Sequence, residues 1–178
     1  MNLSNLIAID LFQIDKAGDD PLTKDYTISV VLNKERVFVY KIPQNVQDVL
    51  INEFKKERLG LSNSKHGRLT FKLRIHCTII ILIIKEILKK NNLTDRHHIE
   101  LCNDYDGHIH EIKDMLFKNL KRDMINLNKE DIVRQKFDKN SLVNMSAYYF
   151  YTNNLDQIKD YYICKFKIED LRDIIKKW

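Results

Sequence analysis

The alternation of apolar and polar residues predicts that three strands with short connections open the chain. The first, at residues 6–14, is mostly apolar, carries Asp10, and is followed by turn-forming residues at 16–21. Residues 26–32 and 36–42 are rich in β-branched and aromatic side chains, and three polar residues separate them, which is typical of a hairpin. The three segments together predict an antiparallel meander.

The spacing of apolar residues predicts the elements of the rest of the chain. Apolar residues three and four positions apart favour helices, whereas short alternating or apolar runs favour strands. In chain order we expect a helix after Pro43, a strand at 98–102, a helix at about 109–120, a strand at 131–137, a helix at 142–151 with Ser141 as its N-cap, a strand at 161–168 and a terminal helix at 169–177. This order predicts an α/β protein with a mixed sheet and helices on its faces.

Residues 68–77 are compatible with two structures. Apolar and polar residues alternate strictly there, which predicts a strand, but the run then becomes continuously apolar and ends in KEILKKNN, which is typical of a helix C-terminus. A strand to about residue 77 followed by a helix, and one long helix from about Arg68, both fit. On a strand the basic residues of this segment would share one face, and on a helix they would be spread around it. They are Arg68, Lys72, Arg74 and His76.

The composition predicts a single globular domain over residues 1–178. Hydrophobic residues make up 44% and charged residues 31%, with only four Gly and two Pro, which excludes general disorder. Cys77, Cys102 and Cys164 are widely spaced in apolar surroundings, which predicts buried thiols in a reducing compartment. Because the start of the chain lacks a secretion signal and no apolar run is long enough to cross a bilayer, we expect a cytoplasmic protein.

Residues 103–120 combine acidic residues and histidines at a predicted strand-to-helix corner. Asp104 and Asp106 precede Gly107, and His108 and His110 follow it. Such corners are where α/β proteins commonly bind their ligands. A further candidate is the strand residue Asp10, because a carboxylate in an apolar strand is costly unless it is paired, solvated or bound to a cation.

The predicted order of elements and the placement of these aspartates resemble the ribonuclease H-like superfamily over most of residues 6–153. In that superfamily an aspartate lies on the first strand, an acidic residue on the first main helix, an aspartate after the fourth strand, and an acidic residue or histidine on the last helix. The resemblance assigns Asp10 to the first position, with Asp15 as a rival, and Asp106 to the third, with Asp104 as a competitor. It implies a ribonuclease H-like fold and a metal-dependent nuclease acting on RNA or DNA.

The chain departs from that pattern at two of the four positions. Asn144 stands where the last acidic ligand is expected, and the first main helix offers Arg74 and His76 in place of a glutamate. Two-metal phosphoryl transfer needs several carboxylates to hold two cations about 3.5–4 Å apart. Two functions therefore stay open, a divergent nuclease and a non-catalytic module on the same fold that binds nucleic acid or protein.

The site residues follow from these considerations. The predicted catalytic residues are Asp10, Asp104 and Asp106, and the predicted ligands of Mg²⁺ or Mn²⁺ are Asp10, Asp106, His108 and His110. The two histidines can share one ion only if the helix begins after them, because residues two apart on a helix point about 200° away from each other.

Nucleic acid is the predicted partner, and the net charge of +5 favours polyanions only moderately. The residues predicted to contact a phosphate backbone are Lys65, Arg68, Lys72, Arg74 and His76. A second contact surface is predicted at residues 148–151, because four adjacent aromatic residues around Tyr148 on one helix cannot all face the core.

Overall fold

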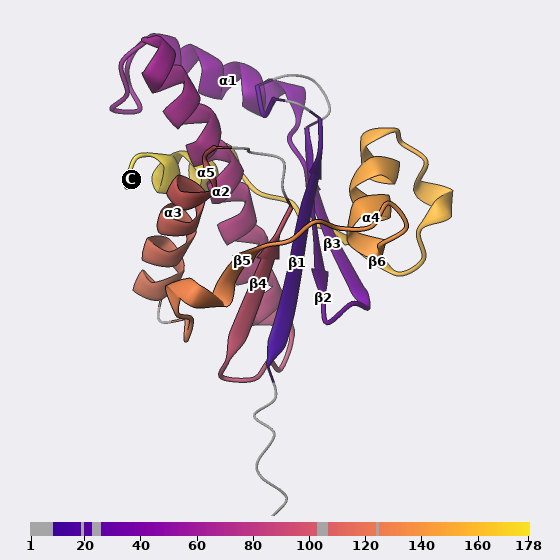
Figure 1. The fold of residues 1–178 in the computed structure, drawn as a ribbon. Coiled ribbons are helices and arrows are strands. Elements are labelled where there is room, and N and C mark those ends of the chain that lie inside the picture. The colour runs from indigo at the N-terminus through magenta and orange to yellow at the C-terminus, as the bar shows by residue number, and fades with distance from the viewer. Residues whose placement is uncertain (1–8, 19, 23–25, 103–106, 124) are drawn as a thin grey trace, which may run out of the picture.

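The computed structural model describes residues 9–18, 20–22, 26–102, 107–123 and 125–178, and its strands form one mixed sheet (Figure 1). The strands are β1 (Asp10–Ala17), β2 (Thr27–Leu32), β3 (Arg36–Lys41), β4 (His97–Leu101), β5 (Ile132–Arg134) and β6 (Tyr161–Ile163). They lie in the order β5-β4-β1-β2-β3-β6. β2 is antiparallel to β1 and β3, and the other pairs are parallel. The predicted α/β class and the opening antiparallel meander are confirmed.

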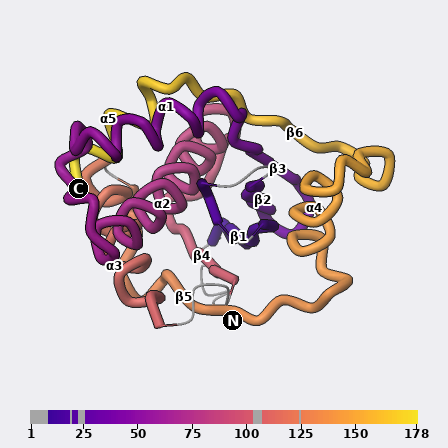
Figure 2. The backbone as a smooth tube through the Cα atoms, turned by 90° about the horizontal axis from the view of Figure 1, so that it is seen from above, coloured from indigo at the N-terminus to yellow at the C-terminus, as the bar shows by residue number. Residues whose placement is uncertain are grey.

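Helices cover both faces of the sheet. Within the described ranges they are α1 (Gln44–Lys55), α2 (Lys65–Lys90), α3 (Ile109–Arg122), α4 (Leu142–Tyr151) and α5 (Ile168–Ile175). Figure 2 shows α1, α2, α3 and α5 on one face and α4 on the other. α4 begins at the predicted N-cap, where the Ser141 hydroxyl accepts a hydrogen bond from the backbone N–H of Asn144.

The alternation of side chains along the strands produces two apolar clusters. Phe12 and Ile14 of β1 belong to the larger cluster, under α1, α2, α3 and α5. Val31 of β2 belongs to the smaller cluster, under α4. Because α4 covers the second face, all six residues of β2 are buried. The sheet therefore has no solvated face at its centre.

Residues 68–77 are helical, so the strand interpretation of this segment is wrong. α2 begins at Lys65, where the Ser64 hydroxyl accepts a hydrogen bond from the N–H of Gly67 at 3.0 Å. A side chain at Gly67 would collide with the carbonyl oxygen of Ser62, so glycine is required there. From Ile75 to Ile81 every residue of α2 is buried, and a helix buried all round shows no amphipathic period. The alternation of apolar and polar residues at 68–77 therefore did not indicate a strand.

Two of the predicted strands were too long. The strands expected at 131–137 and 161–168 are reduced to the three residues of β5 and of β6.

Cys77 and Cys164 are buried and Cys102 is half-buried, and all three are free thiols. Of the helices described, none is long and apolar enough to cross a membrane.

Candidate functional site

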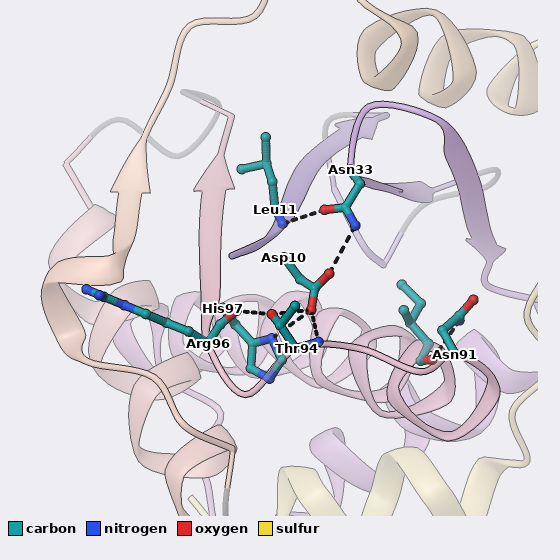
Figure 3. Close-up of polar contacts among 8 residues, drawn as sticks. Asp10, Leu11, Asn33, Asn91, Thr94, Arg96 and His97 are labelled. Atoms are coloured by element: carbon teal, nitrogen blue, oxygen red, sulfur yellow. Dashed lines mark hydrogen bonds and ion pairs between the residues drawn. The ribbon is translucent and has the colours of Figure 1, made fainter. Parts of the chain in front are cut away.

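Asp10 is the first residue of β1 and is buried in a hydrogen-bonded network (Figure 3). Its Oδ1 accepts a hydrogen bond from Nδ2 of Asn33 at 3.0 Å. Its Oδ2 accepts two from Thr94, one from the backbone N–H at 2.5 Å and one from the hydroxyl at 2.7 Å. The carboxylate thus joins the start of β1 to the β2–β3 turn and to the loop between α2 and β4.

The hydrogen bonds decide the charge of Asp10. Burial acts to raise the pKa of its carboxyl group, but the bonds from Asn33 and Thr94 outweigh burial, and the pKa lies below its ordinary value. The imidazole of His97 lies beside it, with Nδ1 3.9 Å from Oδ2. Burial lowers the pKa of His97 in spite of nearby Asp10 and Asp95. Asp10 is therefore a carboxylate whose two oxygens are already bound by donors of the chain.

The register of the sheet separates Asp10 from the end of β4. β1 and β4 are parallel, Asp10 pairs with His97 at the start of β4, and Ile14 pairs with Leu101 at its end. Four residue steps along a strand span about 13 Å. The predicted partners Asp104 and Asp106 lie outside the described residues, and in the sequence they follow the end of β4. Asp10 lies at the start of β4 and not at that end.

The other carboxylate of β1, Asp15, lies two residues before the end of the strand. The backbone N–H of Cys102, which follows β4, donates a hydrogen bond to the carbonyl oxygen of Ile14 at 2.9 Å, so Asp15 is next to the point where β4 ends. Asp15 is 3% exposed, pairs with Ser29 of β2, and accepts a hydrogen bond from the backbone N–H of Lys16 at 2.8 Å. Of the two aspartates of β1, the rival Asp15 is thus the one beside the end of β4, where the predicted corner follows.

On the α2 side of the same strand end, His76 is fully buried. Its Nδ1 lies 2.7 Å from the hydroxyl of Tyr26, and the two rings meet edge to face. Burial, with a smaller contribution from the charge of Lys16, lowers the pKa of His76 to about 3. An adjoining cavity of about 10 Å³, lined in part by Cys102 and Arg134, has room for about one water molecule. His76 is therefore a neutral core residue and not accessible to a phosphate backbone.

The two histidines of the predicted metal site are divided by the start of a helix. α3 begins at Ile109, so His108 is its N-cap residue and His110 lies in its first turn. Nδ1 of His108 is 3.3 Å from a carboxylate oxygen of Glu111, while His110 is exposed. Since the helix does not begin after both histidines, the condition for a shared ion is not met. In the part of the chain that the structure describes, no three His, Cys, Asp or Glu side chains are grouped to hold a metal ion.

The predicted nucleic-acid residues are divided into a surface group and two others. Lys65, Arg68 and Lys72 are spaced three and four positions apart on α2, which places them on one side of the helix. With His66 and Leu69 they line an open hollow of about 560 Å³. Arg74 faces elsewhere, toward α3 and the end of the chain, and His76 is buried. We call Lys65, Arg68 and Lys72 the α2 basic face.

A second hollow of about 420 Å³ extends the α2 basic face toward the C-terminal end of α1. Arg68 and Lys72 line it together with Lys55 and Asp20. Lys72 forms a salt bridge with Asp20, so one positive charge of the basic face is partly offset. We call the turn between α1 and α2, with the adjoining ends of both helices, the α1–α2 corner. It lies at the end of the sheet where β1 ends, at the top of Figure 1.

The four adjacent aromatic residues of α4 do not all face the core, while the contact surface at residues 148–151 stays a prediction. Tyr148 is 55% exposed and Tyr151 39%, whereas Phe150 is buried in the smaller apolar cluster. Asn144, at the position expected to hold the last acidic ligand, follows the N-cap of α4 and is half-buried. At least one aromatic residue of the row therefore reaches the surface.

Sequence reasoning missed the roles of Asn33 and Thr94. Both lie in polar connections, and a signal was present for Asn33, because asparagine is among the residues that tolerate the positive φ of 52° found there. Its side chain also accepts a hydrogen bond from the N–H of Leu11 at 2.8 Å. Nothing in the sequence near Thr94 indicated a contact with β1.

Comparison with known proteins gave no relative: neither a protein-family model, nor a curated protein, nor a solved structure matches the chain.

Proposed function

We propose that the chain is a divergent ribonuclease H-like protein that binds nucleic acid through the α2 basic face and the adjoining end of α1. The order of strands and helices from β1 to α4 agrees with the order on which the resemblance to that superfamily rests. The observation that carries the proposal is that Lys65, Arg68 and Lys72 lie together beside one open hollow. Three cations on one exposed surface suit the regular negative charges of a phosphate backbone.

The composition of the α1–α2 corner supports the same function. Near the three basic residues of α2, the end of α1 and the turn after it carry Lys55, Lys56 and Arg58. The acidic residue Glu57 accepts a hydrogen bond from the N–H of Asn63. Residues 55–72 therefore carry six basic residues and one acidic residue, which is a higher density of positive charge than in the chain as a whole.

Salt dependence of binding tests this proposal. Fluorescence anisotropy of labelled single-stranded and duplex oligonucleotides is measured between about 50 and 200 mM salt, where three phosphate contacts give a log–log slope of about −2 to −3. We expect the double variant Lys65→Gln, Arg68→Gln to weaken binding and to reduce the slope by about 2. An unchanged slope contradicts the proposal, as does the absence of binding at the lowest salt concentration.

A matched control separates a local surface from net charge. Lys136 and Lys139 are exposed residues between β5 and α4, and their double change to Gln removes the same number of charges. We expect this variant to bind as the wild type does. Arg74→Gln should also leave oligonucleotide affinity unchanged, because Arg74 lies off the α2 basic face.

Metal-dependent cleavage is the second candidate function. The observation that favours it is that the buried Asp15 lies beside the end of β4, from which Asp104 and Asp106 follow in the sequence. These three carboxylates, rather than a set that includes Asp10, form the set we propose for Mg²⁺ or Mn²⁺.

A cleavage assay distinguishes the two functions. With Mg²⁺ or Mn²⁺ present, the nuclease function requires cleavage of RNA or DNA that Asp15→Asn and Asp106→Asn abolish. Asp10→Asn serves as the control and should reduce stability without abolishing the reaction. Binding without cleavage under all metal conditions supports the non-catalytic function, and cleavage that depends on Asp10 but not on Asp15 rules out this metal set.

A further inference from the structure

The α2–α3 groove is a hollow of about 470 Å³, lined by residues of α2, α3 and the end of the chain. Figures 1 and 2 show the end marked C on the same side of the sheet as α2 and α3. The volume lies within the range of small-molecule sites. Its basic and aromatic lining residues are Arg74, Lys118, Arg122, Lys177 and Trp178.

Hydrogen-bond donors in this groove lack acceptors. Nε of Arg74 and Nε1 of Trp178 are both buried, and neither has a partner among the residues that the structure describes. Nη1 of Arg74 donates to the carbonyl oxygen of Ile175 at 3.2 Å, which ties α2 to the C-terminal end of α5 but leaves Nε unused. A buried donor without an acceptor is costly, and because both atoms are shielded from solvent, a ligand oxygen reaches them only when these side chains reorient.

The charges of the groove favour an anion. Glu111 and Asp114 also line it, but Glu111 contacts His108, and Asp114 forms a salt bridge with Lys129. No salt bridge of Arg74, Lys118 or Lys177 occurs in the described ranges. Burial lowers the pKa of Arg74 without any carboxylate to offset it. Both acidic side chains therefore have partners, and the four basic residues that line the groove outnumber the two acidic ones.

We propose that the α2–α3 groove binds a small phosphate-bearing molecule. Arginine presents several donors in a planar fork that matches phosphate oxygens, and lysine adds a point charge. Trp178 and Met115 supply an apolar surface against which the organic part of such a ligand packs. The site is separate from the α2 basic face, because the two hollows share no residue.

The chain carries its own reporter for this site, since Trp178 is its only tryptophan. Intrinsic fluorescence is followed while inorganic phosphate, pyrophosphate, AMP or adenosine is added at constant ionic strength. We expect a saturable change with at least one phosphate-bearing compound and none with adenosine. Comparing AMP with inorganic phosphate distinguishes a nucleotide from the free ion as the source of the phosphate.

Variants on α3 complete the test. The exposed residues Lys118 and Arg122 are both changed to Gln, and we expect affinity to fall at least about tenfold, equivalent to about 1.4 kcal/mol of binding free energy. The matched control, Lys113→Gln with Lys121→Gln, removes two charges from the same helix outside the groove and should bind normally.

Three results would overturn the proposal: no saturable signal from any phosphate compound, equal binding of adenosine and AMP, or equal loss in the control variant. Circular dichroism of each variant establishes that the helices are intact. Lys65→Gln with Arg68→Gln should leave phosphate binding unchanged, so failure of the proposed nucleic-acid surface and failure of this groove are distinguishable.

Discussion

Asp10 and Asp15 are two buried carboxylates on one strand, and their surroundings differ. Asp10 begins β1 and Asp15 lies near its other end, and because they are five residues apart their side chains lie on opposite faces of the sheet. Asp10 accepts three hydrogen bonds that connect β1 to two loops. Asp15 is next to the end of β4 and opposite Ser29. An acidic residue in an apolar strand therefore indicates a specific role, and its surroundings decide whether that role is to stabilise the fold or to bind a ligand.

The largest effect is expected from Asp10→Ala. The change removes a buried carboxylate that accepts three hydrogen bonds from Asn33 and Thr94, so we expect a loss of about 3 kcal/mol in the free energy of unfolding. Urea denaturation at pH 7 measures it. Asp48→Ala on the exposed surface of α1 is the control and should change stability by less than about 0.5 kcal/mol. A loss below about 1 kcal/mol for Asp10→Ala contradicts the structural role.

A pH effect tests the opposite end of the sheet. His76 has an ordinary pKa of 6.5 when unfolded and about 3 when folded, so below pH 6.5 only the unfolded chain gains the proton. Stability is therefore lost as pH falls below 6.5, by about 1.4 kcal/mol per pH unit. Between pH 6.5 and 4.5 we expect His76 to contribute a loss of about 2.3 kcal/mol, because the unfolded histidine is already half protonated at pH 6.5.

The variant His76→Gln isolates this contribution, because the other titrating groups are the same in both proteins. Urea denaturation of the wild type and the variant gives stability against pH, and the difference between the two curves should follow the slope given above. Parallel curves would show that His76 is accessible to protons in the folded protein. That result would also restore it as a candidate for contact with a polyanion.

Local sequence signals predicted the meander well and α2 poorly. The segments 26–32 and 36–42 agree closely with β2 and β3 because strand-forming residues and a three-residue turn are local signals. α2 is enclosed by the sheet, α3 and α5, so its apolar residues face every direction. Periodicity reports a helix only when one side faces water.

The candidate site was harder to predict because it depends on register. The sequence placed Asp10 inside a strand at 6–14, whereas it is the first residue of β1, level with His97. A shift of a strand boundary by a few residues decides which end of a parallel pair a carboxylate occupies. The contact of Asp10 with Thr94 joins residues 84 positions apart, and no local pattern encodes such a pairing.

The smallest predicted effect concerns one hydrogen bond of Asp10. Thr94→Val removes the hydroxyl that donates to Oδ2 but keeps the shape of the side chain and the backbone N–H that donates to the same oxygen. We expect a loss of about 1 kcal/mol in unfolding free energy, near the usual value of a single hydrogen bond.

A double-mutant cycle with Asp10→Ala assigns that loss to the pair. When the carboxylate is absent, Thr94→Val should cost almost nothing, so the coupling energy should be about 1 kcal/mol. The Thr94 hydroxyl also lies 2.9 Å from the carbonyl oxygen of Arg96. If the full cost persists in the Asp10→Ala background, the hydroxyl stabilises the loop through Arg96, and the role of Asp10 rests on Asn33 and the backbone N–H of Thr94.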